Sequence, residues 1–93
     1  MIVNFKSPEV ESIWNGTYSR RLPRDIQKTA LKKLRMLNNA QLLLDLAIPP
    51  NKHLEALKGN RAGQHSIRIN DQWRLCFIWT KGGPCDVDIV DYH

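Results

Sequence analysis

A group of basic, acidic and aromatic side chains in the second half of the chain has the types needed to cleave a phosphodiester. They are Lys58, Arg61, Arg68, Arg74, Asp91, Tyr92 and His93. Lys58 and Arg61 flank a glycine-rich turn, and most of the others fall in or beside segments that alternate as β-strands do. Neighbouring strands of an antiparallel meander would bring these side chains onto one surface.

Such a surface suits the cleavage of RNA. Arginine and lysine can hold the charge that develops on the phosphate oxygens, arginine through two parallel hydrogen bonds. His93 or Asp91 could move protons between the 2′-hydroxyl that attacks and the 5′-oxygen that leaves. Tyr92 could stack on a base or donate a hydrogen bond. Because RNA carries its own nucleophile, we expect a reaction that needs no metal ion.

Each of these side chains also has a purely structural interpretation. Arg74 could pair with an acidic neighbour such as Asp88, and Lys58 and Arg61 could be solvated loop residues. His93, at the end of the chain, could belong to a frayed terminus. The three tryptophans are expected in the core rather than in a stacking platform.

The common nucleotide-binding and metal-binding motifs are absent from the sequence. It has no Gly-x-x-x-x-Gly-Lys-Ser/Thr phosphate loop, no Gly-x-Gly-x-x-Gly and no His-x-x-x-His. Cys76 and Cys85 stand nine positions apart, so they form no Cys-x-x-Cys zinc or redox motif. We expect both to behave as small apolar side chains, with a disulfide across neighbouring strands as the alternative.

Length and composition bound the class of protein. The 93 residues are enough for one domain with one core, which we place over 1–93. With 42% hydrophobic and 25% charged residues the chain is globular rather than disordered. The net charge of +5 favours an anionic partner, although basic residues also keep small domains soluble. No apolar run approaches the roughly 18–20 residues of a membrane span, and no secretory signal opens the chain, so we expect a cytoplasmic protein.

The elements that must position these side chains begin with helices in the N-terminal half. Capping residues, acidic first turns and apolar residues at helical spacing predict where they start and stop. The expected elements are a short strand over 1–6, a helix from Ser7-Pro8 to Asn15-Gly16, a helix from Asp25 to Asn38-Asn39 and a short helix over 40–46 before Pro49-Pro50.

The C-terminal half is expected to be β structure. The predicted strands cover 53–57, 64–69, 73–80 and 85–91, with a glycine-rich turn over 58–63 and a further turn over 81–84. A two-residue turn at Asn70-Asp71 would place Arg68 opposite Trp73, whereas a wider turn would change this register. The order of elements predicts an α+β fold, in which an N-terminal strand and two to three helices pack on one face of a mostly antiparallel β-sheet.

Several of these segments together resemble a known family. They are Leu57-Lys58-Gly59-Asn60-Arg61-Ala62-Gly63, Ser66-Ile67-Arg68, Asn70, Trp73-Arg74-Leu75 and the closing Asp91-Tyr92-His93. The chain resembles HigB-type toxins of the RelE/ParE superfamily of toxin–antitoxin modules over essentially its whole length. The resemblance implies a RelE-like fold, an endoribonuclease that cuts mRNA on the ribosome without a cofactor, and a HigA-type helix-turn-helix antitoxin that binds the toxin and represses the operon.

The resemblance also implies roles for individual residues. Lys58, Arg61 and Arg74 would bind and stabilise the phosphate, and the closing Asp91-Tyr92-His93 would line the same cleft. Some HigB toxins have a histidine where Glu55 stands here, so the general base stays open among Glu55, His53, Asp91 and His93, with Arg68 a possible further member of the site. The candidates for contact with ribosomal RNA are Arg20, Arg21, Arg24, Lys28, Lys32 and Lys33.

Two other functions fit the same resemblance. A ParE-type toxin shares the fold but poisons DNA gyrase, and the retained cation-rich cleft with its closing Asp-Tyr-His weighs against it. A weakly active toxin could serve mainly as a transcriptional co-repressor with its antitoxin, which would then provide the contact with operator DNA.

Overall fold

The first helix, α1 (Pro8–Trp14), begins where its capping residues predict. The Ser7 hydroxyl accepts a hydrogen bond from the backbone N–H of Val10, and Pro8 occupies the first helical position. The helix ends at Asn15, and Gly16 follows with a φ of 86°, a left-handed conformation that glycine adopts without strain. The short helix buries Val10 and Ile13 in the core.

The long helix, α2 (Arg24–Asn39), follows the predicted amphipathic pattern and includes both asparagines that were expected to end it. Its apolar residues Ile26, Ala30, Leu34 and Leu37 are buried. The expected third helix is instead a short 3₁₀ helix, η1 (Leu43–Ala47). Asp45 caps this turn, because its carboxylate accepts hydrogen bonds from two preceding backbone N–H groups, so the chain closes a tight turn rather than a new α-helix.

The computed structural model of the protein describes residues 1–47 and 54–91. In its second half, four strands form one antiparallel sheet in the order β1-β2-β3-β4, which confirms the predicted meander. The strands are β1 (Glu55–Ala56), β2 (His65–Arg68), β3 (Trp73–Thr80) and β4 (Gly83–Asp91), and the 3₁₀ turn η3 (Gly59–Arg61) joins the first two. Pro49-Pro50 and His53 lie outside the described residues.

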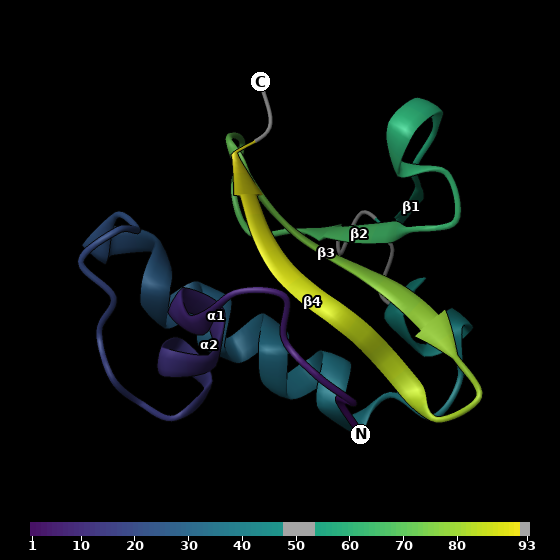
Figure 1. Ribbon diagram of the computed structural model, residues 1–93, viewed down its shortest axis with the longest axis horizontal. Coiled ribbons are helices and arrows are strands. Elements are labelled where there is room, and N and C mark those ends of the chain that lie inside the picture. The colour runs from purple at the N-terminus through teal and green to yellow at the C-terminus, as the bar shows by residue number, and fades with distance from the viewer. Residues whose placement is uncertain (48–53, 92–93) are drawn as a thin grey trace.

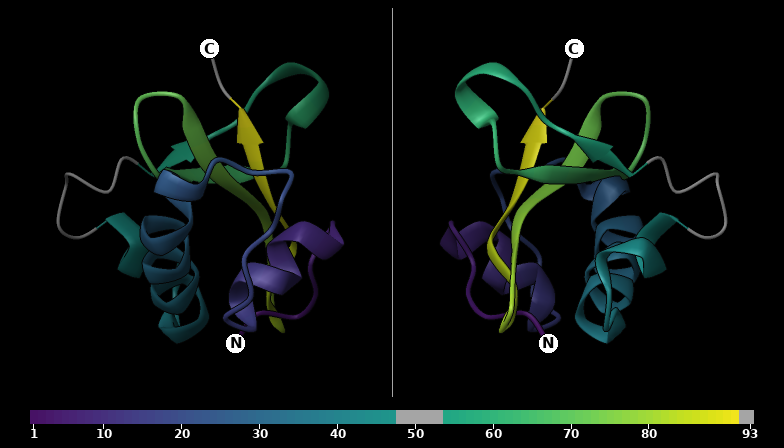
Figure 2. Two further views of the ribbon diagram at one scale, coloured as in Figure 1. Left: turned by 90° about the vertical axis from the view of Figure 1, so that its left-hand side faces the viewer. Right: turned by 90° about the vertical axis from the view of Figure 1, so that its right-hand side faces the viewer.

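The helices cover one face of this sheet (Figures 1 and 2). Side chains from both layers form the core, with Leu34 and Leu37 of α2 packed in one cluster with Leu75, Phe77 and Val87 of the sheet. Figure 2 shows η3 and the last residues of β4 on the side of the molecule remote from α1 and α2. The N-terminus lies near the turn between β3 and β4, at the other end of the sheet (Figure 1).

The segment 1–6 is extended along β4 but forms one parallel bridge, Phe5 to Val87, instead of the expected strand. A bulge in β4 explains the difference, since Asp86 has a φ of 51° and interrupts the ladder. At this point side chains replace the backbone pairing. The Asn4 amide donates to the Asp86 carboxylate at 3.1 Å, and the Asp86 N–H donates to the Asn4 side chain at 2.8 Å.

The turn between β2 and β3 is one residue longer than predicted. The Asn70 side chain accepts hydrogen bonds from the N–H groups of both Gln72 and Trp73, each at 2.8 Å, and this closes a three-residue turn. The two-residue turn was therefore wrong, and Arg68 pairs with Arg74 rather than with Trp73. Directly opposed residues share a face, so both guanidinium groups leave the same side of the sheet.

Within the described ranges, no helix has the length and apolar character that crossing a membrane requires.

Candidate functional site

Arg74 lies on the face of the sheet that the helices leave uncovered. Its strand neighbour Leu75 points into the core, so Arg74 points the opposite way. The residue is only 9% exposed, and its Nε donates a 2.7 Å hydrogen bond to the buried hydroxyl of Ser66 on β2. A guanidinium Nη of Arg74 lies 4.0 Å from the carboxylate of Glu55 on β1. Arg74 therefore has an ion-pair partner in Glu55, one of the candidate bases. The structural interpretation of the sequence had named Asp88 as its acidic neighbour.

The turn η3 places Arg61 beside this face. Gly59 begins the turn with a φ of 66°, and Lys58 immediately precedes it, so Lys58 and Arg61 stand at the two ends of one tight turn. The Arg61 guanidinium donates to the Gln64 side chain at 3.3 Å, which holds it back toward the start of β2. Lys58 is exposed, whereas Arg61 is half-buried.

The buried thiol of Cys76 shows which charges gather at this point. Burial raises the pKa of the thiol above its ordinary value, and the carboxylate of Asp88 acts in the same direction. The positive charges of Arg61, Arg74 and Lys6 oppose the rise in pKa. Three cations and one carboxylate thus lie close enough to the Cys76 thiol to affect its pKa. We call this uncovered face of the sheet the arginine face and define it by Glu55, Arg61, Ser66, Arg74, Cys76 and Asp88.

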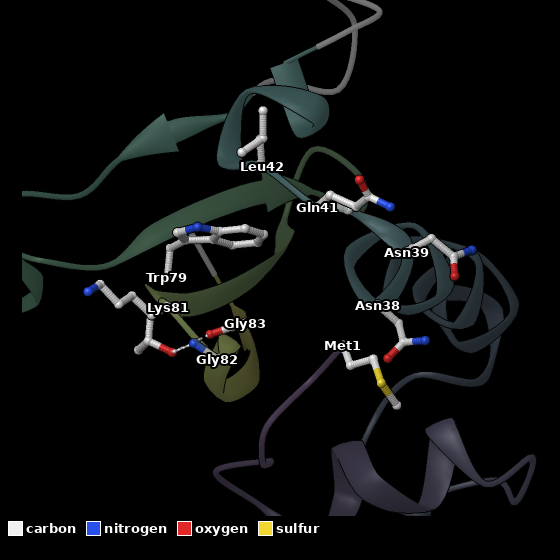
Figure 3. Close-up of a pocket in the computed structure, with 11 residues that line it drawn as sticks. Met1, Asn38, Asn39, Gln41, Leu42, Trp79, Lys81, Gly82 and Gly83 are labelled. Carbon is white, nitrogen blue, oxygen red and sulfur yellow. Dashed lines mark hydrogen bonds between the residues drawn. The ribbon is translucent and has the colours of Figure 1, made fainter.

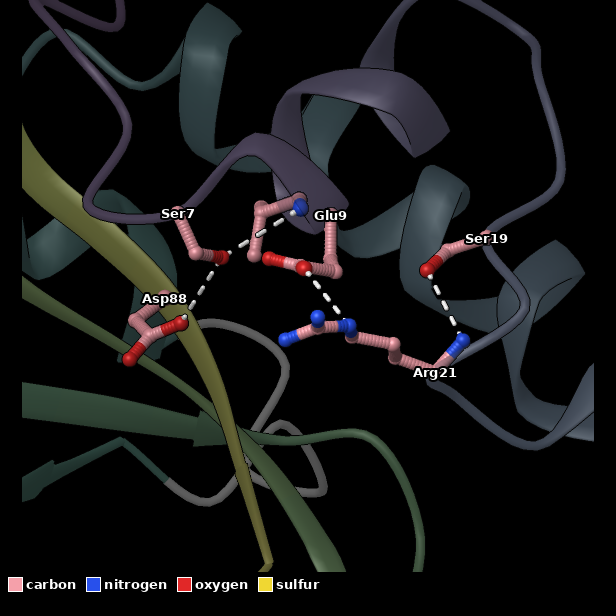
Figure 4. Close-up of polar contacts among 6 residues, drawn as sticks. Ser7, Glu9, Ser19, Arg21 and Asp88 are labelled. Carbon is pink, nitrogen blue, oxygen red and sulfur yellow. Dashed lines mark hydrogen bonds and ion pairs between the residues drawn. The ribbon is translucent and has the colours of Figure 1, made fainter.

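Asp88 connects the arginine face with the N-terminal part of the chain (Figure 4). Its carboxylate accepts a 3.4 Å hydrogen bond from the hydroxyl of Ser7, the residue that caps α1, and a 2.9 Å bond from the N–H of Ile89. In the same view the side chain of Arg21 extends toward Glu9, and its Nε lies 3.5 Å from the Glu9 carboxylate. The sequence did not mark Lys6 or Ser66 as site residues, because only the three-dimensional pairing of strands brings them there.

The structure does not bring Asp91 onto the arginine face. Asp91 pairs with Trp73, while Arg74 pairs with Val90, so the strand register sends Asp91 and Arg74 to opposite faces. The Asp91 carboxylate accepts a 3.1 Å hydrogen bond from Gln72. Arg68 shares the face of Arg74 and forms an ion pair with Asp71. Tyr92, His93 and His53 lie outside the described residues.

The residues expected to contact ribosomal RNA form a separate surface on and before α2. Arg20, Arg21, Arg24, Lys28 and Lys32 are exposed, and Lys33 is half-buried. The Arg24 guanidinium stacks 4.8 Å from the centroid of the exposed Tyr18 ring. The buried side chain of Gln27 fixes the preceding loop, because it accepts from Ser19 N–H and donates to the carbonyls of Ser19 and Leu22 at 2.8 to 3.0 Å.

A pocket of about 550 Å³ lies away from these residues, near the N-terminus and the turn between β3 and β4 (Figure 3). Met1, Asn38, Leu42, Trp79 and Lys81 are among its lining residues, and no site residue predicted from the sequence lines it. Both cysteines are free, so the alternative of a disulfide is wrong. Over residues 1–47 and 54–91, His, Cys, Asp and Glu side chains form no cluster of three or more suited to a metal ion.

Comparison with known proteins gives a consistent family. The sequence model described as RelE-like toxin of type II toxin-antitoxin system HigB matches residues 4–93. The chain is similar to Toxin HigB-1 of Vibrio cholerae serotype O1, with 40% identity over 83 residues that make up 88% of this chain and 87% of that protein. It is also similar to an uncharacterized protein of Haemophilus influenzae, with 34% identity over 62 residues, or 67% of this chain and 61% of that protein.

Proposed function

This chain belongs to the RelE-like toxins of the HigB type II toxin–antitoxin family, and we propose that it is an endoribonuclease that cuts messenger RNA on the ribosome and so stops translation. The family implies an antitoxin partner. We propose that this partner is a HigA-like helix-turn-helix protein and that the toxin reaches operator DNA only through it. The site of action would be the cytoplasm, where ribosomes and mRNA are found.

One observation supports the nuclease function more than any other: the buried guanidinium of Arg74 lies on the face of the sheet that the helices leave uncovered, held by Ser66, and Arg61 stands in the turn η3 that leads into β2 beside it. Two guanidinium groups there can bind the non-bridging oxygens of a phosphate and stabilise the negative charge that grows on them during the reaction. The burial of Arg74 strengthens this effect, since charges interact more strongly where water is excluded. Lys58, next to the same turn, would add a further positive charge.

The proposed reaction uses the substrate's own hydroxyl. The 2′-oxygen loses its proton and attacks phosphorus, a new P–O2′ bond forms, and the P–O5′ bond breaks as the 5′-oxygen takes up a proton. Glu55 and Asp88 are the carboxylates of the arginine face, and Glu55 lies beside Arg74. We propose Glu55, His53 and His93 as the candidates for proton transfer and Tyr92 for contact with a base. Asp91 is not among them, because the strand register sends it to the face opposite Arg74. The reaction needs no metal ion or other cofactor.

Contact with the ribosome would use the other basic surface. Arg20, Arg21, Arg24, Lys28 and Lys32 lie on or beside α2, which packs on the opposite face of the sheet from Arg74. One molecule could therefore bind ribosomal RNA with this surface while the arginine face meets the mRNA. The phosphates of ribosomal RNA are the anionic partner that the net charge of +5 favours.

The proposal is tested with purified protein, ribosomes and a synthetic mRNA. We expect cleavage of ribosome-bound mRNA but not of free mRNA, with 2′,3′-cyclic phosphate and 5′-hydroxyl ends. A single 2′-deoxynucleotide at the cut position is the matched control, because it removes the nucleophile and little else. Cleavage that survives this change would contradict the proposed chemistry. Intact mRNA together with cleaved DNA trapped on gyrase would identify a ParE-type poison instead.

A further inference from the structure

We infer that Ser66 is a positioning residue, whose hydroxyl holds the guanidinium of Arg74 in the orientation that meets the scissile phosphate. The inference rests on the proposed nuclease function, because it assigns Ser66 a part in that reaction. Ser66 itself need not touch the substrate. It would act through Arg74.

The first support is the geometry of the pair. Ser66 is 0% exposed and accepts the Nε–H of Arg74 at 2.7 Å, a short hydrogen bond between two buried side chains. The register explains the contact, since Ser66 lies directly opposite Cys76 and Arg74 is two residues away along β3. Such diagonal neighbours on one face are within reach of a long side chain.

The second support is that the Ser66 hydroxyl binds the Nε–H of Arg74 and not one of its Nη groups. An arginine side chain has several rotatable bonds and five N–H donors in a planar fork. Because Ser66 takes Nε, the plane of the fork is set and the two Nη nitrogens are the groups through which Arg74 would meet phosphate oxygens. Glu55 faces one Nη from 4.0 Å with a side chain that is 54% exposed, so the hydrogen bond to the buried hydroxyl is tighter than this ion pair.

The third support is that packing alone does not require a hydroxyl at this position. Alanine would fill nearly the same volume at this position opposite Cys76. The hydroxyl is needed because a buried Nε–H without an acceptor is unfavourable. The Ser66 hydroxyl is therefore explained by its hydrogen bond to the Arg74 guanidinium.

The experiment compares Ser66→Ala with the parent protein in single-turnover cleavage of ribosome-bound mRNA. We expect the cleavage rate at saturating ribosome to fall roughly tenfold or more, with unchanged affinity for the ribosome. Thr80→Ala is the matched control, since it removes a 2.7 Å hydroxyl hydrogen bond at the far end of β3. That variant should cleave at the parental rate.

Two further measurements separate positioning from a merely structural role. In an Arg74→Lys background, which lacks the Nε–H, Ser66→Ala should cause little additional loss. Hydrogen exchange at Arg74 Nε, followed by NMR on the protein alone, should be slow in the parent and faster in Ser66→Ala. The NMR measurement does not depend on nuclease activity.

The outcomes are distinguishable. A parent protein that cleaves no mRNA overturns the proposed function and with it the role assigned to Ser66, whereas the exchange measurement still decides whether the hydroxyl holds Arg74. An active parent with a fully active Ser66→Ala variant overturns the inference alone. The inference is also overturned if Ser66→Ala weakens ribosome binding instead of cleavage. It is overturned as well if Ser66→Ala causes as large a loss of activity in the Arg74→Lys background as in the parent protein.

Discussion

Arg74 is a charged side chain in a place where water is largely excluded, and this decides how strongly it can act. A guanidinium in such a site stabilises an oxyanion more than it would at the surface, because the surrounding dielectric is lower. Its contacts with Ser66 and Glu55 also fix its position before any substrate arrives. Preorganised charge of this kind is a main source of catalysis in enzymes that stabilise developing anions.

Replacing Arg74 by alanine should lower the cleavage rate by about 10²–10³-fold, the usual effect of removing one donor to a developing oxyanion. The variant should still bind the antitoxin, which can be measured by co-purification and calorimetry. Lys81→Ala, which removes a positive charge beyond the far end of β3, serves as the control. An Arg74→Ala protein that cleaves as fast as Lys81→Ala would rule Arg74 out of the reaction.

The thiol of Cys76 gives a prediction for the dependence of stability on pH. Burial, with a smaller effect of Asp88, raises its pKa above the ordinary 9.0, so the folded state holds the proton more tightly than the unfolded chain. This contribution to the free energy of unfolding is complete below about pH 9 and is lost as the pH rises through the raised pKa. Urea unfolding should therefore show that the free energy of unfolding falls less between pH 8 and pH 10 for Cys76→Ala than for the parent. An equal fall in both proteins would contradict the raised pKa of the Cys76 thiol.

Among the elements, the loop before α2 depends on one buried amide. Gln27 makes hydrogen bonds with the backbone of Ser19 and Leu22, so its replacement would leave backbone groups unsatisfied. We expect Gln27→Ala to lower the free energy of unfolding by about 1–3 kcal/mol. It should also weaken ribosome binding while the cleavage rate of bound mRNA stays close to that of the parent.

Thermal unfolding, ribosome sedimentation and hydrogen exchange of the Ser19 amide would measure these effects. Gln41→Ala is the control, because Gln41 is exposed on the surface. If both glutamine variants behave alike, the loop does not depend on Gln27.

Most elements could be predicted from local sequence signals. Ser7 and Pro8 cap α1, and the alternation of apolar residues marks β3. The details that differ depend on side chains that bond across a turn or between distant segments. Asn70 lengthens the turn between β2 and β3, and Asn4 pairs with Asp86 at the bulge of β4. Neither contact leaves a periodic pattern in the sequence.

The same limit applied to the site. Lys58, Arg61 and Arg74 were identified by residue type, by the turn that holds the first two and by the family resemblance. Ser66 stood in a segment of the family resemblance but had no role assigned to it, and Lys6 carried no signal. The pairing of β2 with β3 brings Ser66 to Arg74, and the bridge to β4 brings Lys6 near Cys76. Asp88 was predicted only as a structural partner, and its place beside Arg61 and Arg74 depends on the exact register.

Across the molecule, the positive charge is divided between the arginine face and the surface around α2. If that second surface binds ribosomal RNA, association should weaken as salt increases, since each phosphate that a lysine or arginine neutralises releases counterions. The double variant Lys28→Ala/Lys32→Ala should reduce the slope of log affinity against log salt by about one for each lysine that binds a phosphate. Lys81→Ala should leave the slope unchanged.

Ribosome sedimentation over a range of salt concentrations gives both slopes. A double variant with the parental slope would move the ribosome-binding site to another surface. A Lys81→Ala variant that lowers the slope as much would show that only the total charge matters.

The most direct test of the central proposal is to map mRNA 5′ ends in cells after induction of this chain, with translation running or blocked at initiation. We predict new 5′ ends confined to translated regions, absent when initiation is blocked, and abolished when Arg74 is replaced by alanine. Growth arrest with intact mRNA, or cuts that persist on untranslated RNA, would contradict the account of a ribosome-dependent nuclease.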